Sequence, residues 1–194
     1  EALRNSSTRD LASFLLVSGR APTAVLLCEF FDEARGRAFA AACGAQAIGS
    51  SHQLCHDPAA QHRAWEVRRL GLGLISNQPG RQKGVAVIED ACVPVEKLAE
   101  YTRFVYAACA RLGIHTATYA HASVGVLHFK ALLDLHEEPD RKALRALSEE
   151  CFAECLRLGG VFSGEHGDGI VRGEFVEKQF GPALYQAFRE IKAL

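Results

Sequence analysis

The sequence predicts an α+β fold, in which an antiparallel sheet carries helices packed on one face and the α/β units are ferredoxin-like. Apolar runs rich in β-branched and aromatic residues alternate with helical stretches along the 194 residues. In the second half, two such runs follow each other across a short turn, and no repeated crossover between parallel strands is evident. No low-complexity linker divides the chain, so we expect residues 1–194 to form one domain.

The first half of the chain predicts short strands between helices. Continuous apolar runs predict strands at 24–31 (AVLLCEFF) and 45–50 (AQAIGS), and polar or alanine-rich stretches predict helices at 1–21, 32–43 and 57–75. Asp57 is a suitable N-cap for the third helix. Pro58 suits its first position, because that position needs no hydrogen-bonded N–H.

The second half predicts the sheet. Strands are expected at 84–94, 115–121 and 126–135, with a short one at 161–163, and helices at 95–112, at 139–158 and from about 181 onward. Cys151 and Cys155 lie on the apolar stripe of the helix 139–158, together with Leu144 and Leu147. We therefore expect both thiols to belong to the core rather than to a metal or redox pair.

The composition argues against a nucleic-acid-binding protein and against a membrane protein. With 48% hydrophobic residues, 23% charged residues and a net charge of -1, the chain has no electrostatic footprint for nucleic acid or an anionic membrane. The seven scattered cysteines and the lack of a signal peptide or spanning segment predict reduced thiols in a cytoplasmic protein. Peripheral attachment at the inner membrane is the alternative. The chain starts at Glu1 rather than Met and ends within a predicted helix, so we expect it to be part of a longer protein.

Two histidines, His121 and His128, lie in the stretch YAHASVGVLHFK, residues 119–130. A straight strand rising about 3.3 Å per residue would hold them roughly 23 Å apart, on opposite faces. Ser123 and Gly125 favour a turn between them, so we expect a hairpin that brings the two imidazoles together. Paired imidazoles suit a divalent metal, and the alternative is two structural histidines beside the turn.

A second candidate is the glycine-rich stretch SGEHGDG, residues 163–169. Glycines at this spacing make sense where the backbone closely approaches another group. Glu165 and His166 are adjacent, so in an extended segment they point in opposite directions, and one could be a metal ligand while the other is a free base. The alternative is a solvent loop with incidental charges.

Arg68 and Lys130 are the candidate cations. Arg68 shares a helical face with a tryptophan and a leucine, and its guanidinium offers a fork of donors suited to a carboxylate. Lys130 points to the same strand face as His128. The alternatives are an arginine that snorkels or pairs with a nearby glutamate, and a solvated strand lysine.

Four stretches together resemble a known family. AWEVRRLGLGLI, VAVIEDACVPVEKL, YAHASVGVLHFK and GGVFSGEHGDGIVRGEF resemble, in this order, the C-terminal substrate domain of FAD-linked oxidases. That group includes D-lactate dehydrogenases, glycolate oxidase subunits and D-2-hydroxyglutarate dehydrogenases of the vanillyl-alcohol-oxidase superfamily. The resemblance covers about residues 20–194. It implies that FAD is bound mainly by a separate N-terminal domain, which agrees with the lack of a GxGxxG turn or P-loop in this chain.

The resemblance also implies roles for individual residues. His121, His128 and Glu165 match ligands of a divalent metal, zinc or manganese, and His166 matches the active-site base. Arg68 matches an arginine that binds the substrate carboxylate, and Lys130 falls where the family has Arg or Asn.

The implied activity is oxidation of a small D-2-hydroxy acid (D-lactate, glycolate or D-2-hydroxyglutarate) to a 2-oxo acid. The implied partners are the FAD domain of the same protein and an iron–sulphur domain or subunit as electron acceptor. Nucleic acid is not expected as a partner. The chain by itself would then be catalytically silent. The rival classes are a metal-dependent hydrolase, which would use water in place of the substrate hydroxyl, and a non-catalytic interaction domain.

Overall fold

The structure is a computed structural model that describes residue 16, residues 19–77 and residues 79–194. The helix predicted over 1–21 lies outside the described residues except for its last few positions. The chain divides into two compact units, residues 1–77 and residues 78–194, and each is described by itself. The single domain expected over residues 1–194 stays a prediction. Among the described residues, no helix combines the length and the apolar character needed to cross a membrane.

The described part of the unit of residues 1–77 contains two helices that begin at aspartate caps, α2 (Glu33–Ala45) and α3 (Pro58–Ser76). The carboxylate of Asp32 accepts hydrogen bonds from the N–H groups of Ala34 and Arg35. Asp57 accepts one from Ala60 N at 2.9 Å, and Pro58 occupies the first turn. The cap predicted at Asp57 is confirmed, because its side chain satisfies a donor that the helix leaves free.

The two strands predicted in this unit are wrong. Residues 24–31 form no strand, and several of their apolar side chains are exposed, including Leu26 and Phe31. Residues 45–50 complete α2 and then turn. None of residues 24–31 is assigned to a strand, so β-rich composition alone does not produce a sheet here.

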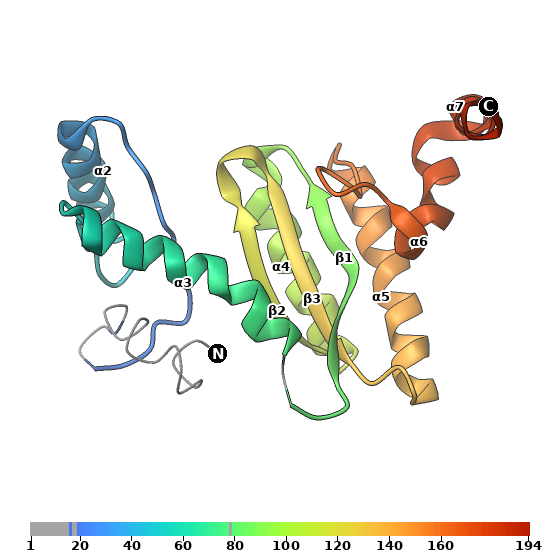
Figure 1. Cartoon of the computed structure of the whole chain (residues 1–194), viewed down its shortest axis with the longest axis horizontal. Coiled ribbons are helices and arrows are strands. Elements are labelled where there is room, and N and C mark those ends of the chain that lie inside the picture. The colour runs from blue at the N-terminus through green and yellow to red at the C-terminus, as the bar shows by residue number, and fades with distance from the viewer. Residues whose placement is uncertain (1–15, 17–18, 78) are drawn as a thin grey trace. The chain divides into compact units, whose positions relative to one another are not determined.

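The unit of residues 78–194 is built on three antiparallel strands, β1 (Lys83–Cys92), β2 (His115–His121) and β3 (Val126–Leu133), in the order β1-β3-β2 (Figure 1). The predicted antiparallel α+β architecture is confirmed. The turn between β2 and β3 is a single 3-10 turn, η3 (Ala122–Val124), followed by Gly125 at φ 77°. That left-handed conformation favours glycine.

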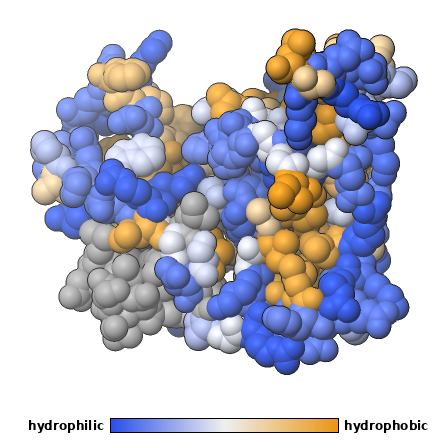
Figure 2. Space-filling view, turned by 45° about the vertical axis from the view of Figure 1, so that its right-hand side comes forward, coloured by the Kyte–Doolittle hydropathy of each residue, from blue (hydrophilic) through white to orange (hydrophobic). Residues whose placement is uncertain are grey.

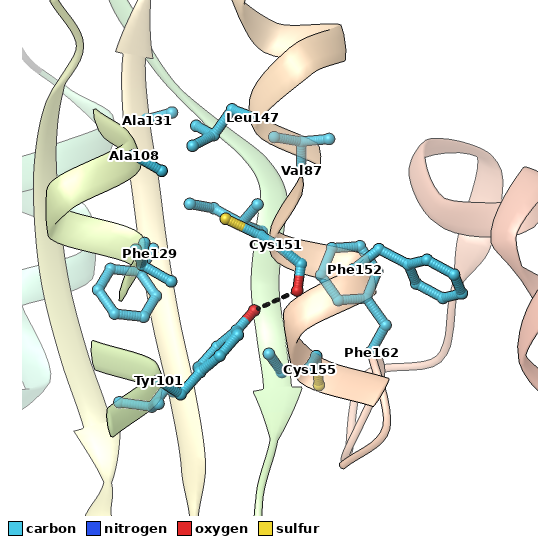
Figure 3. Close-up of a cluster of buried hydrophobic side chains, with 14 of the residues drawn as sticks. Val87, Tyr101, Ala108, Phe129, Ala131, Leu147, Cys151, Phe152, Cys155 and Phe162 are labelled. Carbon is cyan, nitrogen blue, oxygen red and sulfur yellow. Dashed lines mark hydrogen bonds between the residues drawn. The ribbon is translucent and has the colours of Figure 1, made fainter. Parts of the chain in front are cut away.

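Two helices cover one face of the sheet, α4 (Leu98–Arg111), which follows the short 3-10 turn η2 (Val95–Lys97), and α5 (Glu138–Arg157). Phe129 of β3 and Tyr101 of α4 are fully buried beside Cys151 and Cys155 of α5 (Figure 3). The Tyr101 hydroxyl donates a hydrogen bond to the Cys151 carbonyl at 3.2 Å, which joins the two helices inside the core. The core assignment of both cysteines is confirmed.

The end of the chain differs from its prediction. Val161 forms only an isolated bridge with Cys92, so the strand expected at 161–163 is wrong. Two short turns, α6 (Gly169–Arg172) and η4 (Gly173–Phe175), precede α7 (Val176–Ala193), which begins earlier than predicted and kinks at Gly181 (φ 79°, ψ 165°). Four large hydrophobic side chains of α7 are exposed: Phe180, Leu184, Phe188 and Ile191. Figure 2 shows hydrophobic residues, in orange, reaching the surface on the face in view.

The two faces of the sheet have different chemistry. Along β3, Leu127, Phe129, Ala131 and Leu133 alternate toward the helices and belong to the core cluster. His128 and Lys130 alternate toward the opposite face. A carboxylate from β1, Glu89, pairs in register with His128 on that face. Titratable side chains therefore gather on the face of the sheet opposite α4 and α5.

Candidate functional site

The hairpin β2–β3 brings His121 and His128 together, as predicted. Their ring centroids are 5.4 Å apart, and the ring planes lie at 89° to each other. His121 ends β2 and pairs with Val126, and His128 lies two residues further along β3, so both rings extend from the face opposite α4 and α5. His121 is half-exposed, whereas His128 is fully buried.

His128 is the innermost member of the cluster. Its ring stacks on Tyr119, the residue opposite it in β2, with centroids 4.5 Å apart, and on His166, with centroids 5.2 Å apart. Neither ring nitrogen has a hydrogen-bond partner among the described residues. Burial lowers the pKa of His128. The neighbouring His166 and His121 lower it further, whereas the carboxylate of Glu165 raises it. The ring is therefore held neutral, the form in which an imidazole nitrogen can donate to a metal.

The glycine-rich loop supplies Glu165 and His166 to the same place. Glu165 Oε1 lies 3.1 Å from Nε2 of His128, 3.5 Å from Nε2 of His121 and 3.4 Å from Nε2 of His166. The expectation that Glu165 and His166 point in opposite directions is wrong. The loop is bent rather than extended at these residues, so the strand alternation assumed for them does not apply.

Asp90 of β1 is the reason for the bend. It is fully buried, and its carboxylate accepts hydrogen bonds from the Ser163 hydroxyl at 2.8 Å, from Glu165 N at 3.0 Å and from His166 N at 2.9 Å. Burial acts to raise the pKa of Asp90, but these hydrogen bonds prevail and the pKa is lowered. One ionised carboxylate thus holds two successive N–H groups of the loop.

Arg172 and Gly164 complete the attachment of the loop to β1. Arg172 is buried and donates to the carbonyls of Glu89 at 2.8 Å, Ala86 at 3.2 Å and Gly167 at 2.6 Å. A Cβ on Gly164 would lie 2.9 Å from the Cβ of Cys92, closer than real contacts of this kind. The glycine is therefore required by close approach of the loop to the strand.

Glu89 lies behind the histidines. Its Oε1 is 3.7 Å from Nδ1 of both His128 and His166 and accepts a hydrogen bond from the Tyr119 hydroxyl at 3.1 Å. Its Oε2 forms an ion pair with Lys130 Nζ. Burial lowers the pKa of Lys130, and the charge of Arg172 adds to that shift. Lys130 does lie on the His128 face, as predicted, with its charge already opposed by a carboxylate.

Arg68 is the one predicted site residue that belongs to the other unit. It lies in α3 and is half-buried, while Trp65, three residues earlier on the same helix, is 41% exposed. The structure thus brings together His121, His128, Lys130, Glu165 and His166, and describes Arg68 in the unit of residues 1–77.

The cluster offers ligand atoms of the types that bind divalent metals. The ligand atoms of Asp90, His128, Glu165 and His166 all lie within 4.8 Å of one another. His121 Nε2 adds a further nitrogen beside Glu165. Two or three imidazoles and a carboxylate are the donor set of catalytic zinc sites, which keep one position for water or substrate.

Sequence reasoning missed Asp90, Glu89 and Arg172 as parts of the site. Each lies far along the chain from at least one group it contacts, and only the folded sheet joins them: Asp90 contacts the amide of a residue 75 positions later. A detectable signal was the adjacent pair Glu89 and Asp90 inside an otherwise apolar strand, because buried acids require partners.

Comparisons with known proteins show the family to which the chain belongs. Residues 14–194 match the family described as FAD linked oxidases, C-terminal domain. D-2-hydroxyglutarate dehydrogenase of Haemophilus influenzae is 34% identical over 143 residues, which are 74% of this chain and 14% of that protein. D-lactate dehydrogenase of Archaeoglobus fulgidus is 36% identical over 115 residues, 59% of this chain and 25% of that protein. Glycolate oxidase subunit GlcD of Bacillus subtilis is 27% identical over 128 residues, 66% of this chain and 26% of that protein. The chain thus spans only a small part of the length of these relatives.

Proposed function

We propose, since the chain belongs to the family of the C-terminal domains of FAD linked oxidases, that it is the substrate-binding part of an FAD-dependent D-2-hydroxy acid dehydrogenase. The reaction would oxidise the α-hydroxyl of D-lactate, glycolate or D-2-hydroxyglutarate to a 2-oxo acid. The names of its relatives support this class of substrate. FAD would be bound by another part of the protein, and an iron–sulphur domain or subunit would receive the electrons.

The observation that carries the proposal is the convergence of imidazole nitrogens on one carboxylate oxygen. Nε2 of His121, His128 and His166 all lie within 3.5 Å of Glu165 Oε1. His128 is fully buried with both nitrogens lacking a hydrogen bond, an arrangement that costs free energy unless another group binds there. The site therefore fits a divalent metal.

His121, His128 and Glu165 would hold that metal, zinc or manganese. When bound, the metal supplies a Lewis acid toward the substrate hydroxyl, and FAD supplies the two-electron oxidant. The remaining chemistry belongs to the chain. His166 reaches the cluster through Nε2, and Glu89 lies behind its Nδ1, so Nε2 can accept the hydroxyl proton while Nδ1 faces a carboxylate.

Arg68 and Lys130 are the proposed cations for the substrate carboxylate. A guanidinium can bind a carboxylate through two parallel hydrogen bonds, which suits Arg68 to the stronger contact. Lys130 lies on the His128 face beside Glu89, where its charge also stabilises that buried carboxylate. We expect Lys130→Ala to weaken acid binding less than Arg68→Ala does.

The proposal is tested by calorimetric titration of zinc and of manganese into the 194-residue chain. We expect stoichiometric binding by the wild type and loss of binding in His121→Ala. The matched control is His115→Ala, which removes an exposed histidine from the other end of the same strand and should leave binding unchanged. D-lactate and D-2-hydroxyglutarate are then titrated into the metal-loaded protein, where binding that depends on the metal places the substrate at this cluster.

Three results would contradict the proposal. Equal zinc binding by His121→Ala and the wild type would mean that the histidine pair is structural. Metal-dependent hydrolysis by the chain without flavin would favour the hydrolase alternative. If the metal-loaded chain binds neither D-lactate nor D-2-hydroxyglutarate, the metal site exists but does not bind the proposed substrates.

A further inference from the structure

Asp90 has an unusual backbone for a residue inside a strand. Its φ is 75°, and the pairing of β1 with β3 shifts register between Glu89 and Ala91, so Asp90 is the extra residue of a β-bulge. In a regular strand, Asp90 would follow Glu89 on the face covered by the helices. The bulge instead turns its carboxylate toward the loop of residues 163–167. A strained residue of this kind in a strand suggests a local function.

Asp90 binds that loop through both its side chain and its backbone. Ser163 Oγ, Glu165 N and His166 N donate to its carboxylate, and Gly164 N donates to its carbonyl at 2.8 Å. Two successive amides that point at one carboxylate curl the chain around it. The side chains of Glu165 and His166 then leave on the same side and meet His128.

We propose that Asp90 is the positioning residue that aims Glu165 and His166 at His128, and that it is not itself a ligand of the metal; this inference rests on the proposed function. Proximity alone would allow the ligand role, since Asp90 lies within 4.8 Å of the other ligand atoms. Its contacts favour the positioning role. Both carboxylate oxygens already accept hydrogen bonds from the loop, and the residue is fully buried, whereas Glu165 and His166 are half-exposed.

Arg172 supports the same arrangement from the other side. Its Nη2 lies 3.7 Å from Asp90 Oδ2 and donates to the Gly167 carbonyl, while its Nη1 donates to the carbonyl of Glu89. The loop is thus attached to β1 at both ends of the Glu165–His166 pair. Outer groups of this kind, when removed, typically reduce metal affinity by about 10–100-fold without being ligands.

The test combines amide hydrogen exchange with zinc titration on the 194-residue chain. In the metal-free wild type, we expect the amides of Glu165 and His166 to exchange about 10–100-fold more slowly than in an unstructured peptide, as a charge-assisted hydrogen bond implies. In Asp90→Asn, both amides should lose that protection, the core amide of Phe129 should keep its own, and zinc affinity should fall by about 10–100-fold.

Asp134→Asn is the matched control. Asp134 is also a buried carboxylate that accepts a backbone hydrogen bond, from His136 N at 3.0 Å, and it lies outside the cluster. We expect this variant to leave both the exchange of Glu165 and His166 and the zinc affinity unchanged.

Three outcomes would overturn the inference. Weaker zinc binding in Asp90→Asn with unchanged exchange at Glu165 and His166 would make Asp90 a ligand. Faster exchange with unchanged zinc affinity would mean that the loop attachment does not aim the site. If the amides of Glu165 and His166 exchange in the wild type as fast as in an unstructured peptide, they do not form the hydrogen bonds to Asp90. This result does not depend on whether Asp90→Asn folds. Absence of zinc binding in the wild type would instead contradict the proposed function, while the exchange rates would still decide whether Asp90 holds the loop.

Discussion

Gly125, in the turn that joins the two histidines, offers a quantitative test of why the hairpin closes. Its φ of 77° is left-handed, and its carbonyl accepts a hydrogen bond from Val93 N at 3.0 Å. A Cβ added here would lie deep inside van der Waals contact with the Val93 carbonyl oxygen. Gly125→Ala therefore combines backbone strain with a clash that must displace the hydrogen-bonded partner.

The magnitude follows from these two contributions. A left-handed residue with a Cβ costs about 1–2 kcal/mol, and loss of the Val93 hydrogen bond costs about 0.5–1.5 kcal/mol. We therefore expect Gly125→Ala to lower the free energy of unfolding by about 1.5–3.5 kcal/mol. Gly113→Ala is the matched control, because Gly113 has a φ of 71° but no atom within 4 Å of an added Cβ. It should cost only about 1–2 kcal/mol.

The assay is urea unfolding followed by far-ultraviolet circular dichroism. Trp65, the single tryptophan, lies in the unit of residues 1–77, and its fluorescence is recorded in the same titration to follow that unit separately. Equal losses of stability in Gly125→Ala and Gly113→Ala would refute the reasoning, because the clash with Val93 would then contribute nothing.

Three further predictions concern the core and the buried titratable groups. Tyr101→Phe removes the buried hydrogen bond to the Cys151 carbonyl and should lower the free energy of unfolding by about 0.5–1.5 kcal/mol in urea titrations; no change would contradict a bond in the core. The lowered pKa of His128 implies that metal-free stability falls as pH drops from about 6.5 toward the folded pKa, because the unfolded chain binds the proton more readily; His128→Phe should weaken this dependence between pH 8 and pH 5.5, and an identical slope would exclude it. Burial raises the pKa of Cys155 to about 12, so a thiol reagent at pH 8 should modify exposed Cys28 in the native protein and Cys155 only after unfolding, whereas equal rates would contradict its burial.

The elements governed by local chemistry were predictable from the sequence. The helix start at Asp57 and Pro58 and the left-handed turn at Gly125 follow from the conformational preferences of single residues. The hairpin followed because two β-rich runs flank that turn. The meeting of His121 and His128 is a direct consequence of the hairpin, so half of the cluster could be anticipated from one short stretch.

The parts that depended on distant neighbours could not be predicted. The run 24–31 has the composition of a strand but is not assigned to one, because composition does not supply the partner strand that a sheet needs. The shared direction of Glu165 and His166 depends on hydrogen bonds to Asp90, a residue in another element. Strand alternation therefore gave the wrong orientation for this pair, because a tertiary contact sets the backbone there.

The bulge at Asp90 also has a consequence for the order of folding. His121 and His128 meet as soon as a hairpin of local contacts forms, which is a fast step. Glu165 and His166 join them only when their amides reach a residue about 75 positions earlier in the chain. The cluster is thus assembled in two stages from contacts of very different range. An ion that requires the full set would act only on chains that have completed the second stage, and would slow their unfolding more than it speeds their folding.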